Sequence, residues 1–215
     1  MANLLLTKIS CAIVDMDEDN IETILQEALD QGIPMEDIYE IGLNNGMLEV
    51  TRKFESNEYY VSEVIVCADT LNKGILFLRG KGGQRKVNGP KVLIAVVEGD
   101  FHEIGKNIVK IMFEAANFDV IDLGINQTSN DIIRAAKEHN VDVITLSTMM
   151  TTTMGKMKDV IDTINNSDLK GKFKIIIGGG CISDKYAKEI NADGYSKNAI
   201  DAVKLVKFLM LGNAS

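Results

Sequence analysis

The chain has 215 residues, of which 46% are hydrophobic and 25% are charged, and its formal net charge is -8. This composition predicts one or two globular domains, and the acidic balance argues against a nucleic-acid partner, which requires a basic footprint. No apolar run reaches the roughly 20 residues that span a bilayer, and the N-terminus does not resemble a signal peptide, so we expect a cytoplasmic protein without a membrane partner.

Residues 1–79 show the spacing of amphipathic helices and contain no convincing strand. Apolar stripes occupy four ranges: 4–13, 21–29, 34–54 and 61–76. Gly32 and Pro34 mark the boundary between the second and third helices, and Ser56 or Asn57 is expected to cap the fourth. Four helices with short connections predict a helical bundle.

Residues 80–91 break this pattern, because they are rich in glycine and basic side chains and almost free of apolar ones. This composition is typical of a flexible linker, although a basic patch for an acidic partner or a phosphate is an open alternative. We therefore expect a helical domain over 1–79, a linker over 80–91 and a second domain over 92–215.

From residue 92 onward, short apolar runs alternate with helical patterns. Strands are expected at 92–98, 119–123, 142–147, 173–178 and 193–195. Helices are expected at 104–117, 128–139, 154–165, 184–190 and 198–211. Strands that alternate with helices predict a parallel sheet with right-handed crossovers. The second domain is therefore expected to be an α/β, flavodoxin-like (Rossmann-type) doubly wound five-stranded sheet.

The first strand of this domain runs into a loop that carries chemistry, Val97-Glu98-Gly99-Asp100-Phe101-His102-Glu103-Ile104-Gly105. In open α/β sheets, ligands bind at the carboxyl ends of the strands. Asp100 can orient the imidazole of His102 through one ring nitrogen, and Gly105 allows a bulky ligand to approach the backbone. The alternative is an ordinary surface histidine with a chance neighbour.

Two further loops follow strands at the same edge of the predicted sheet. The third strand runs into Ser147-Thr148-Met149-Met150-Thr151-Thr152-Thr153, whose hydroxyls can bind a polar ligand or cap the next helix. The fourth strand ends in Gly178-Gly179-Gly180, where missing side chains let a large group lie against the backbone. A phosphate loop is the rival interpretation, but the Lys-Ser/Thr pair that it needs is missing.

These three loops, in this order, resemble the cobalamin-binding motif of methionine synthases and corrinoid methyl-carrier proteins. The Asp100-x-His102-x-x-Gly105 pattern carries the resemblance, and Ala192-Asp193-Gly194-Tyr195 matches a further strand of that family. Tyr59-Tyr60-Val61-Ser62-Glu63-Val64 looks like the fourth helix of the family's helical cap, with Ser62 where a proline is usual. The chain therefore resembles, over its full length, the small corrinoid proteins of anaerobic methyltransferase systems.

The resemblance implies that the cofactor is cobalamin and that His102 is the axial cobalt ligand. It implies a network from cobalt through His102 and Asp100 to Thr153, with Thr148 at a variable position. Ser147 and Thr151 would approach the lower nucleotide loop, and Tyr195 would border the nucleotide tail unless it is simply a half-buried edge residue. The expected cofactor-binding set is Gly99, Asp100, Phe101, His102, Glu103, Ile104, Gly105, Ser147, Met149, Thr151, Thr153, Gly178, Gly179, Gly180 and Tyr195.

The resemblance also implies a carrier subunit that has no catalytic barrel of its own. Such a protein takes a methyl group from a substrate-specific methyltransferase as cob(I)alamin and holds it as methylcobalamin. It then passes the group to a methyltransferase that acts on tetrahydrofolate or coenzyme M. A reductive activase restores the cofactor after oxidation to forms such as hydroxocobalamin. The donor would be a methoxylated aromatic (an O-demethylase system), a methylamine, a quaternary amine or methanol.

Two other classes remain open from the sequence. A cobalamin-dependent sensor would share this domain pair, but such sensors usually carry an aromatic-rich cap and a DNA-binding module, and this chain has no Trp. An isomerase subunit that uses adenosylcobalamin would need a large barrel. We assign no role to Cys181, which follows the glycine run.

Overall fold

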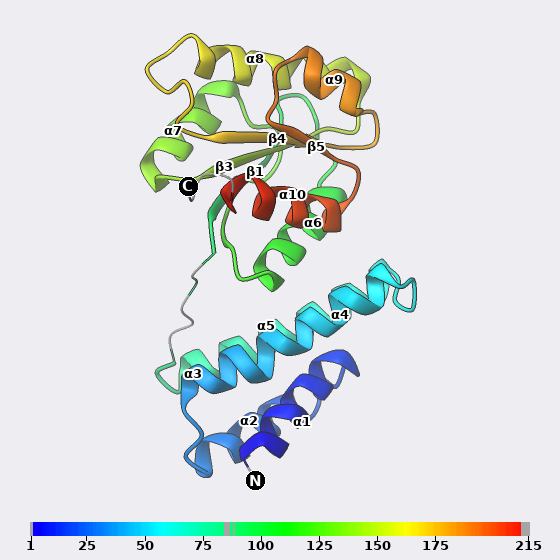
Figure 1. Cartoon of the computed structure of the whole chain (residues 1–215), viewed down its shortest axis with the longest axis vertical. Coiled ribbons are helices and arrows are strands. Elements are labelled where there is room, and N and C mark those ends of the chain that lie inside the picture. Colours follow the sequence, from blue (N-terminus) through cyan, green and yellow to red (C-terminus); the bar gives the residue numbers. More distant parts are fainter. Residues whose placement is uncertain (1, 84–86, 88, 212–215) are drawn as a thin grey trace. The chain divides into compact units, whose positions relative to one another are not determined.

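The computed structural model describes residues 2–83, 87 and 89–211. The chain divides into two compact units, a helical unit within residues 1–88 and an α/β unit that begins at Gly89 (Figure 1). This architecture confirms the predicted fold class, a helical bundle followed by a doubly wound parallel sheet. Within the described ranges, no helix is both long and apolar enough to cross a lipid bilayer.

The N-terminal unit consists of helices at the places that the apolar stripes predict. Its elements are α1 (Ala2–Val14), α2 (Ile21–Asp30), α3 (Met35–Asp37), the π-helical segment η1 (Ile38–Asn44), α4 (Asn45–Glu55) and α5 (Val61–Gly80). The elements α3, η1 and α4 follow one another without a break and form the single third helix of the predicted bundle. The π-helical turn inside this helix was not expected from the sequence.

Two glycines allow the third helix to approach α1 closely. A Cβ atom on Gly46 would lie 2.8 Å from the Cβ of Ile13, and one on Gly42 would lie 3.0 Å from Ile9 Cγ2. At this crossing, Ser10 Oγ donates a 2.7 Å hydrogen bond to the carbonyl oxygen of Gly42 within the π-helical segment. The small residues thus bring the two backbones together, and the serine satisfies a carbonyl there.

The predicted cap of the fourth helix at Ser56 or Asn57 is wrong. These residues instead end α4, since Ser56 N donates to Arg52 O and Asn57 adopts a left-handed φ of 59°. The fourth helix, α5, begins after Tyr60, whose backbone N–H donates to Glu63 Oε2 over 2.9 Å. A left-handed Asn is a frequent helix terminator, which explains why the capping signal belonged to the preceding helix.

The predicted linker 80–91 is only partly covered by the structure. Its first residue, Gly80, belongs to α5, and its last, Lys91, begins the first strand. Residues 84–86 and 88 lie outside the described residues, so the flexible linker expected there stays a prediction.

The C-terminal unit alternates strands and helices. Its elements are β1 (Lys91–Val96), α6 (Ile104–Ala115), β2 (Asp119–Asp122), α7 (Ser129–His139), β3 (Val143–Ser147), the 3-10 turn η2 (Thr151–Thr153), α8 (Met154–Asn165), β4 (Lys174–Gly178), α9 (Asp184–Glu189), β5 (Gly194–Ser196) and α10 (Ala199–Leu211). Within the described part of this unit, the strands form one parallel sheet in the order β2-β1-β3-β4-β5. This is the flavodoxin-like order, in which ligands bind where the winding direction changes, between β1 and β3.

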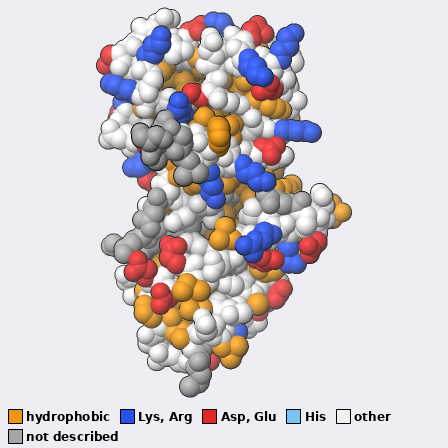
Figure 2. All heavy atoms as spheres, in the orientation of Figure 1, with side chains coloured by type: hydrophobic (Ala, Val, Ile, Leu, Met, Phe, Trp, Pro, Cys, Tyr) orange, Lys and Arg blue, Asp and Glu red, His pale blue; other side chains and the backbone are white. Residues whose placement is uncertain are grey.

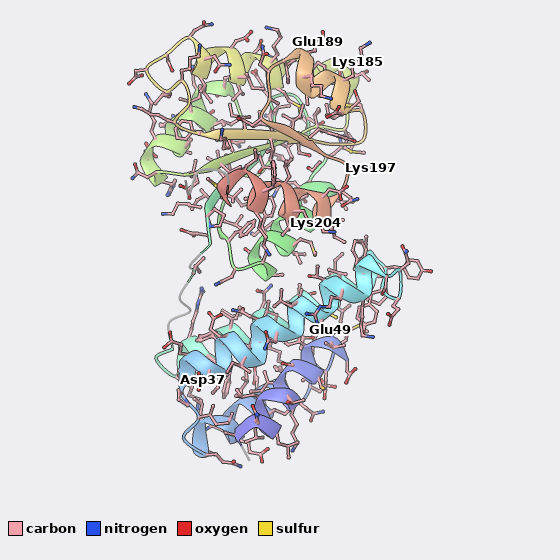
Figure 3. All side chains as sticks on the ribbon, in the orientation of Figure 1. Asp37, Glu49, Lys185, Glu189, Lys197 and Lys204 are labelled. Carbon is pink, nitrogen blue, oxygen red and sulfur yellow. The ribbon has the colours of Figure 1, made fainter. Side chains whose placement is uncertain are left out.

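Helices cover both faces of the sheet. Figure 1 shows α6 and α10 on one face and α7, α8 and α9 on the other. Because both faces are covered, the consecutive residues 92–96 of β1 are all buried, with Leu93 and Ala95 in the core beneath α7 and α8. Lys185 and Glu189 mark the exposed side of α9 in Figure 3. On the face drawn in Figure 2, acidic and basic side chains are intermixed over this unit.

Candidate functional site

The strand register aligns the carboxyl ends of four neighbouring strands. Val96 of β1 pairs with Ser147 of β3, Ser147 pairs with Gly178 of β4, and Gly178 pairs with Ser196 of β5. The loops that follow β1, β3 and β4 therefore leave the sheet at one edge. The site residues that the sequence predicts on these three loops therefore lie at the same edge. We call residues 97–103, which follow β1, the ligand loop.

Within the ligand loop, a buried carboxylate holds an exposed histidine. Asp100 is fully buried, whereas the side chain of His102 is 58% exposed. Asp100 Oδ1 lies 2.7 Å from Nδ1 of His102 and also accepts the backbone N–H of His102 over 2.9 Å. No other described residue hydrogen-bonds the ring, so its Nε2 is available to a ligand.

The second carboxylate oxygen of Asp100 is held from β3. Thr148 Oγ1 donates to Oδ2 over 2.5 Å, and the backbone N–H of Met149 donates to the same oxygen over 2.7 Å. Thr153 Oγ1 lies 2.6 Å from Thr148 Oγ1 and donates to Met150 O. The expected direct bond from Thr153 to Asp100 is therefore corrected: Thr148 stands between them, and it is the residue that the sequence placed at a variable position.

These hydrogen bonds keep the carboxyl group of Asp100 ionised and determine which ring nitrogen of His102 carries a proton. Burial alone would raise the pKa of the Asp100 carboxyl, but the donors from Thr148, from the amides of His102 and Met149 and from the imidazole outweigh it. Together they hold that pKa well below its ordinary value. A carboxylate can only accept hydrogen bonds, so His102 Nδ1 must carry a proton toward it. In the neutral imidazole, Nε2 then has a free lone pair, which is the state that binds a metal ion.

The glycine run brings the β4 loop against the β3 loop. Gly179 has a φ of 129°, and a Cβ atom there would lie 1.8 Å from the carbonyl oxygen of Thr148. Thr148 N also donates to Gly178 O over 3.3 Å. At Gly179 the space left by the missing side chain is thus filled by protein backbone rather than left open. Contact between Gly178, Gly179 and Gly180 and a cofactor stays a prediction.

Exposed apolar side chains flank His102 in the chain, and another lies in the loop after β3. Phe101 is 63% exposed, Ile104 is 76% exposed and Met149 is 48% exposed. Gly105 adds to this surface, because nothing lies within 4 Å of the position of its absent Cβ. Exposed apolar groups gathered at the edge of a sheet are typical of a surface that a ligand or partner covers.

The remaining predicted residues are placed less centrally. Ser147 is half-buried at the end of β3, while Glu103 and Thr151 are exposed on their loops. Tyr195 is half-buried in β5 and packs against the hydrophobic core, as its alternative interpretation expected. Their contacts with a cofactor stay predictions.

Besides Thr148, a second residue of the site was missed by sequence reasoning. Asn126, in the loop after β2, accepts the backbone N–H of Gly99 on its Oδ1 over 2.8 Å. It follows Asp122-Leu123-Gly124, and the only sequence signal was an Asn two residues after a turn glycine at the carboxyl end of a strand.

Comparisons with known proteins agree with this geometry. A family model described as a B12 binding domain matches residues 90–204, and a second model with the same description matches residues 5–79. The chain belongs to the B12-binding family of corrinoid proteins.

Two relatives align with nearly the full length of this chain. The chain is 34% identical to a corrinoid protein of Desulfitobacterium hafniense strain Y51 over 96% of this chain and 97% of that protein. It is 36% identical to dimethylamine corrinoid protein 2 of Methanosarcina acetivorans over 97% of each chain.

Two solved structures share its fold. The methanol:cobalamin methyltransferase complex MtaBC from Methanosarcina barkeri matches with a TM-score of 0.88 and 28% identity, over 97% of this chain and 80% of that one. A cobalamin-binding protein from Desulfitobacterium hafniense DCB-2 matches with a TM-score of 0.73 and 30% identity, over 94% and 97% of the two chains. These relationships identify cobalamin as the cofactor of this corrinoid protein.

The residues present fit this cofactor. An imidazole whose Nδ1 is held by a carboxylate and whose Nε2 is free suits an axial position on a transition metal. The exposed Phe101, Ile104 and Met149 provide an apolar surface beside it for a large macrocycle. The residues at this edge of the sheet therefore have the chemistry that the cofactor of this family requires.

Proposed function

We propose that this corrinoid protein carries a methyl group between two methyltransferases and that His102 is the axial ligand of its cobalt. The observation that supports this most directly is the hydrogen bond between His102 Nδ1 and the buried carboxylate of Asp100, which leaves Nε2 free. The cobalt of the bound corrinoid supplies the chemistry, because it accepts and releases the methyl group.

The protein's own residues tune the axial position. Asp100 holds the ring in one tautomer and one orientation, as carboxylate partners of metal-ligating histidines do. Thr148 and the amide of Met149 hold the carboxylate in turn. Because these donors keep the carboxylate charged, it continues to accept from His102 Nδ1 and leaves Nε2 for the metal.

The relatives support a methylamine or methanol as the methyl donor. Two similar proteins from Methanosarcina are named dimethylamine and trimethylamine corrinoid proteins, and a similar structure is a methanol methyltransferase complex. We propose a substrate-specific methyltransferase as the first partner and a tetrahydrofolate- or coenzyme M-dependent methyltransferase as the second, with a reductive activase. Neither a methoxylated aromatic donor nor a sensor role gains support from these relatives.

Electron paramagnetic resonance of the protein reconstituted with cob(II)alamin tests the axial ligand. A coordinated ¹⁴N nucleus splits the cobalt signal into triplets, and ¹⁵N splits it into doublets. Protein labelled with ¹⁵N-histidine should therefore show doublets, which distinguishes His102 from the cofactor's own benzimidazole base.

The chain contains one other histidine, which provides a matched control. His102→Ala should lose the histidine splitting, while His139→Gln, at the end of α7, should keep it. Triplets from the labelled wild-type protein, or doublets that persist in His102→Ala, would contradict the proposed ligand.

The donor is tested with partner enzymes. The reduced, cobalamin-loaded protein is mixed with a dimethylamine-, trimethylamine- or methanol-specific methyltransferase and its substrate, and methylation is followed by its absorbance change. We expect methylation with a methylamine enzyme or the methanol enzyme. Absence of methylation with all of these enzymes would contradict the proposed donor class.

A further inference from the structure

The loop after β2 contacts the ligand loop through Asn126. The side-chain Oδ1 of Asn126 accepts the backbone N–H of Gly99 over 2.8 Å, and the backbone N–H of Asn126 donates to the carbonyl oxygen of Asp100 over 3.1 Å. One residue therefore holds the two positions that immediately precede Phe101 and His102. Because Gly99 donates an N–H, the atom facing it must be the amide oxygen of Asn126, which fixes the orientation of that side chain.

The conformation of Asn126 suits this contact. Its φ of 55° lies in the left-handed region, which Asn adopts more readily than other residues with a side chain. Gly99, the partner, also has a positive φ of 83°. Two residues in unusual backbone conformations therefore meet at one hydrogen bond, and neither would be held there by ordinary secondary structure.

The loop that carries Asn126 is itself fixed to the sheet. Val96 N donates to Gly124 O over 3.0 Å, and Gln127 N donates to Val96 O over 2.9 Å, so the loop is hydrogen-bonded to the end of β1. Gly124 N also donates to Asp122 Oδ1, and the buried Lys106 contacts both oxygens of that carboxylate. Asn126 therefore projects from a supported loop rather than from a free one.

The ligand loop is held from both of its neighbouring strands. On the β3 side, Thr148 and Met149 hold the carboxylate of Asp100. On the β2 side, Asn126 holds the carbonyl of the same residue and the amide of Gly99. The first set of contacts fixes the side chain that orients the imidazole, and the second fixes the backbone from which that side chain projects.

We infer that Asn126 is a positioning residue for the axial histidine, a role that rests on the proposed ligation of cobalt by His102. Loss of its Oδ1 leaves the Gly99 amide without its partner and frees the loop to shift at a glycine. The position of His102 Nε2 is then no longer fixed. Supporting groups of this kind usually change metal affinity by about 10- to 100-fold.

A set of variants separates the acceptor from the backbone conformation. Asn126→Gly removes Oδ1 but tolerates the left-handed backbone, so it introduces no strain. Asn126→Asp keeps an acceptor oxygen at the same place. Asn140→Gly is the matched control, because Asn140 is also left-handed, with a φ of 50°, but lies at the end of α7 before β3, at the opposite edge of the sheet.

The readouts are the dissociation constant for cob(II)alamin and the fraction of the cobalt signal that shows histidine nitrogen splitting. We expect Asn126→Gly to bind about tenfold more weakly and to lose much of the splitting. Asn126→Asp and Asn140→Gly should remain close to wild type. Circular dichroism and the thermal midpoint establish that each variant is folded.

The inference is overturned if Asn126→Gly keeps wild-type affinity and splitting. It is also overturned if Asn126→Asp loses as much affinity and splitting as Asn126→Gly. The wild-type spectrum separates this failure from failure of the proposed function. If ¹⁵N-histidine splitting is absent in the wild type, the ligand assignment is wrong and this inference falls with it. If the splitting is present and Asn126→Gly is unaffected, only the positioning role is wrong.

Discussion

The hydroxyl of Thr148 lies 2.5 Å from Oδ2 of Asp100, and both side chains are fully buried. This bond ties the end of β3 to the ligand loop after β1, across the point where the winding of the sheet changes direction. The carboxylate of Asp100 is thereby held on one oxygen by β3 while its other oxygen holds His102. The position of the imidazole thus depends on a residue 46 positions away in the chain.

Replacing Thr148 with Val should weaken both folding and cofactor binding. The change removes the donor to a buried carboxylate, and hydrogen bonds to charged groups contribute about 1.5–3 kcal/mol. We expect the free energy of unfolding of the apoprotein, measured in urea, to fall by about this amount. Thr153→Val is the matched control, because Thr153 does not donate to Asp100, and it should cost about 1 kcal/mol. A larger loss in Thr153→Val than in Thr148→Val would contradict the hydrogen-bond order.

The low pKa of Asp100 predicts that the free energy of unfolding depends on pH in the acidic range. Its folded pKa lies below its ordinary value of 3.8, so the ionised carboxylate contributes stability that is fully present above about pH 5. This contribution is lost as the pH falls toward the folded pKa. Asp100→Asn should therefore flatten the decline in unfolding free energy of the apoprotein between about pH 5 and 2. Asp168→Asn, at a side chain that is 80% exposed, should leave the decline unchanged, and equal slopes in all three proteins would contradict the prediction.

Much of the C-terminal unit could be predicted from the sequence, because its signals are local. Buried strands read as apolar runs, and each strand and helix lies within two or three residues of its expected place. The pairing of Asp100 with His102 was also predictable, since the two residues are separated by one position in a single loop. Strand register then follows from the parallel topology and brings the loops to one edge.

What the sequence did not predict depends on distant contacts. Thr148 and Asn126 act on the ligand loop only because β3 and β2 flank β1, and neither residue has a local pattern that distinguishes it from other polar loop residues. The close approach at Gly179 was not predicted for the same reason, because its neighbour is the backbone of Thr148 in another loop. Likewise, the π-helical segment of the cap faces Ser10, more than 30 positions away.

The two loops that meet at Gly179 predict a sharp difference between neighbouring glycines. In Gly179→Ala, the new methyl group would lie 1.8 Å from Thr148 O, and the φ of 129° is unsuitable for Ala, so the β3 loop must move. We expect a loss of about 2–4 kcal/mol in the free energy of unfolding. In Gly180→Ala, the methyl group meets the flexible end of Met149 at 2.7 Å, which can rotate away, so the loss should be below about 1 kcal/mol. Urea denaturation measures both, and equal losses would contradict the described packing.

The cysteines provide a prediction for the N-terminal unit. Cys67 is fully buried, and burial raises the pKa of its thiol to about 12, whereas Cys11 is exposed. At pH 8 only about one Cys67 thiol in 10,000 would be ionised even if a reagent could reach it, and the thiolate is the reactive form. Iodoacetamide should therefore alkylate Cys11 in the folded protein and reach Cys67 only when the helical unit opens.

Mass spectrometry of the peptides at successive times measures the two rates. Urea at concentrations that unfold the protein should make the rates equal, and Cys11→Ser should leave the slow rate of Cys67 unchanged. Equal rates in the folded protein would contradict the burial of Cys67 within α5, where its Sγ lies 3.6 Å from the carbonyl oxygen of Val14. Because the thiol can be reached only after α5 separates from α1, the slow rate divided by the rate in urea also gives the fraction of time that the helical unit is open, provided that reclosing is faster than alkylation.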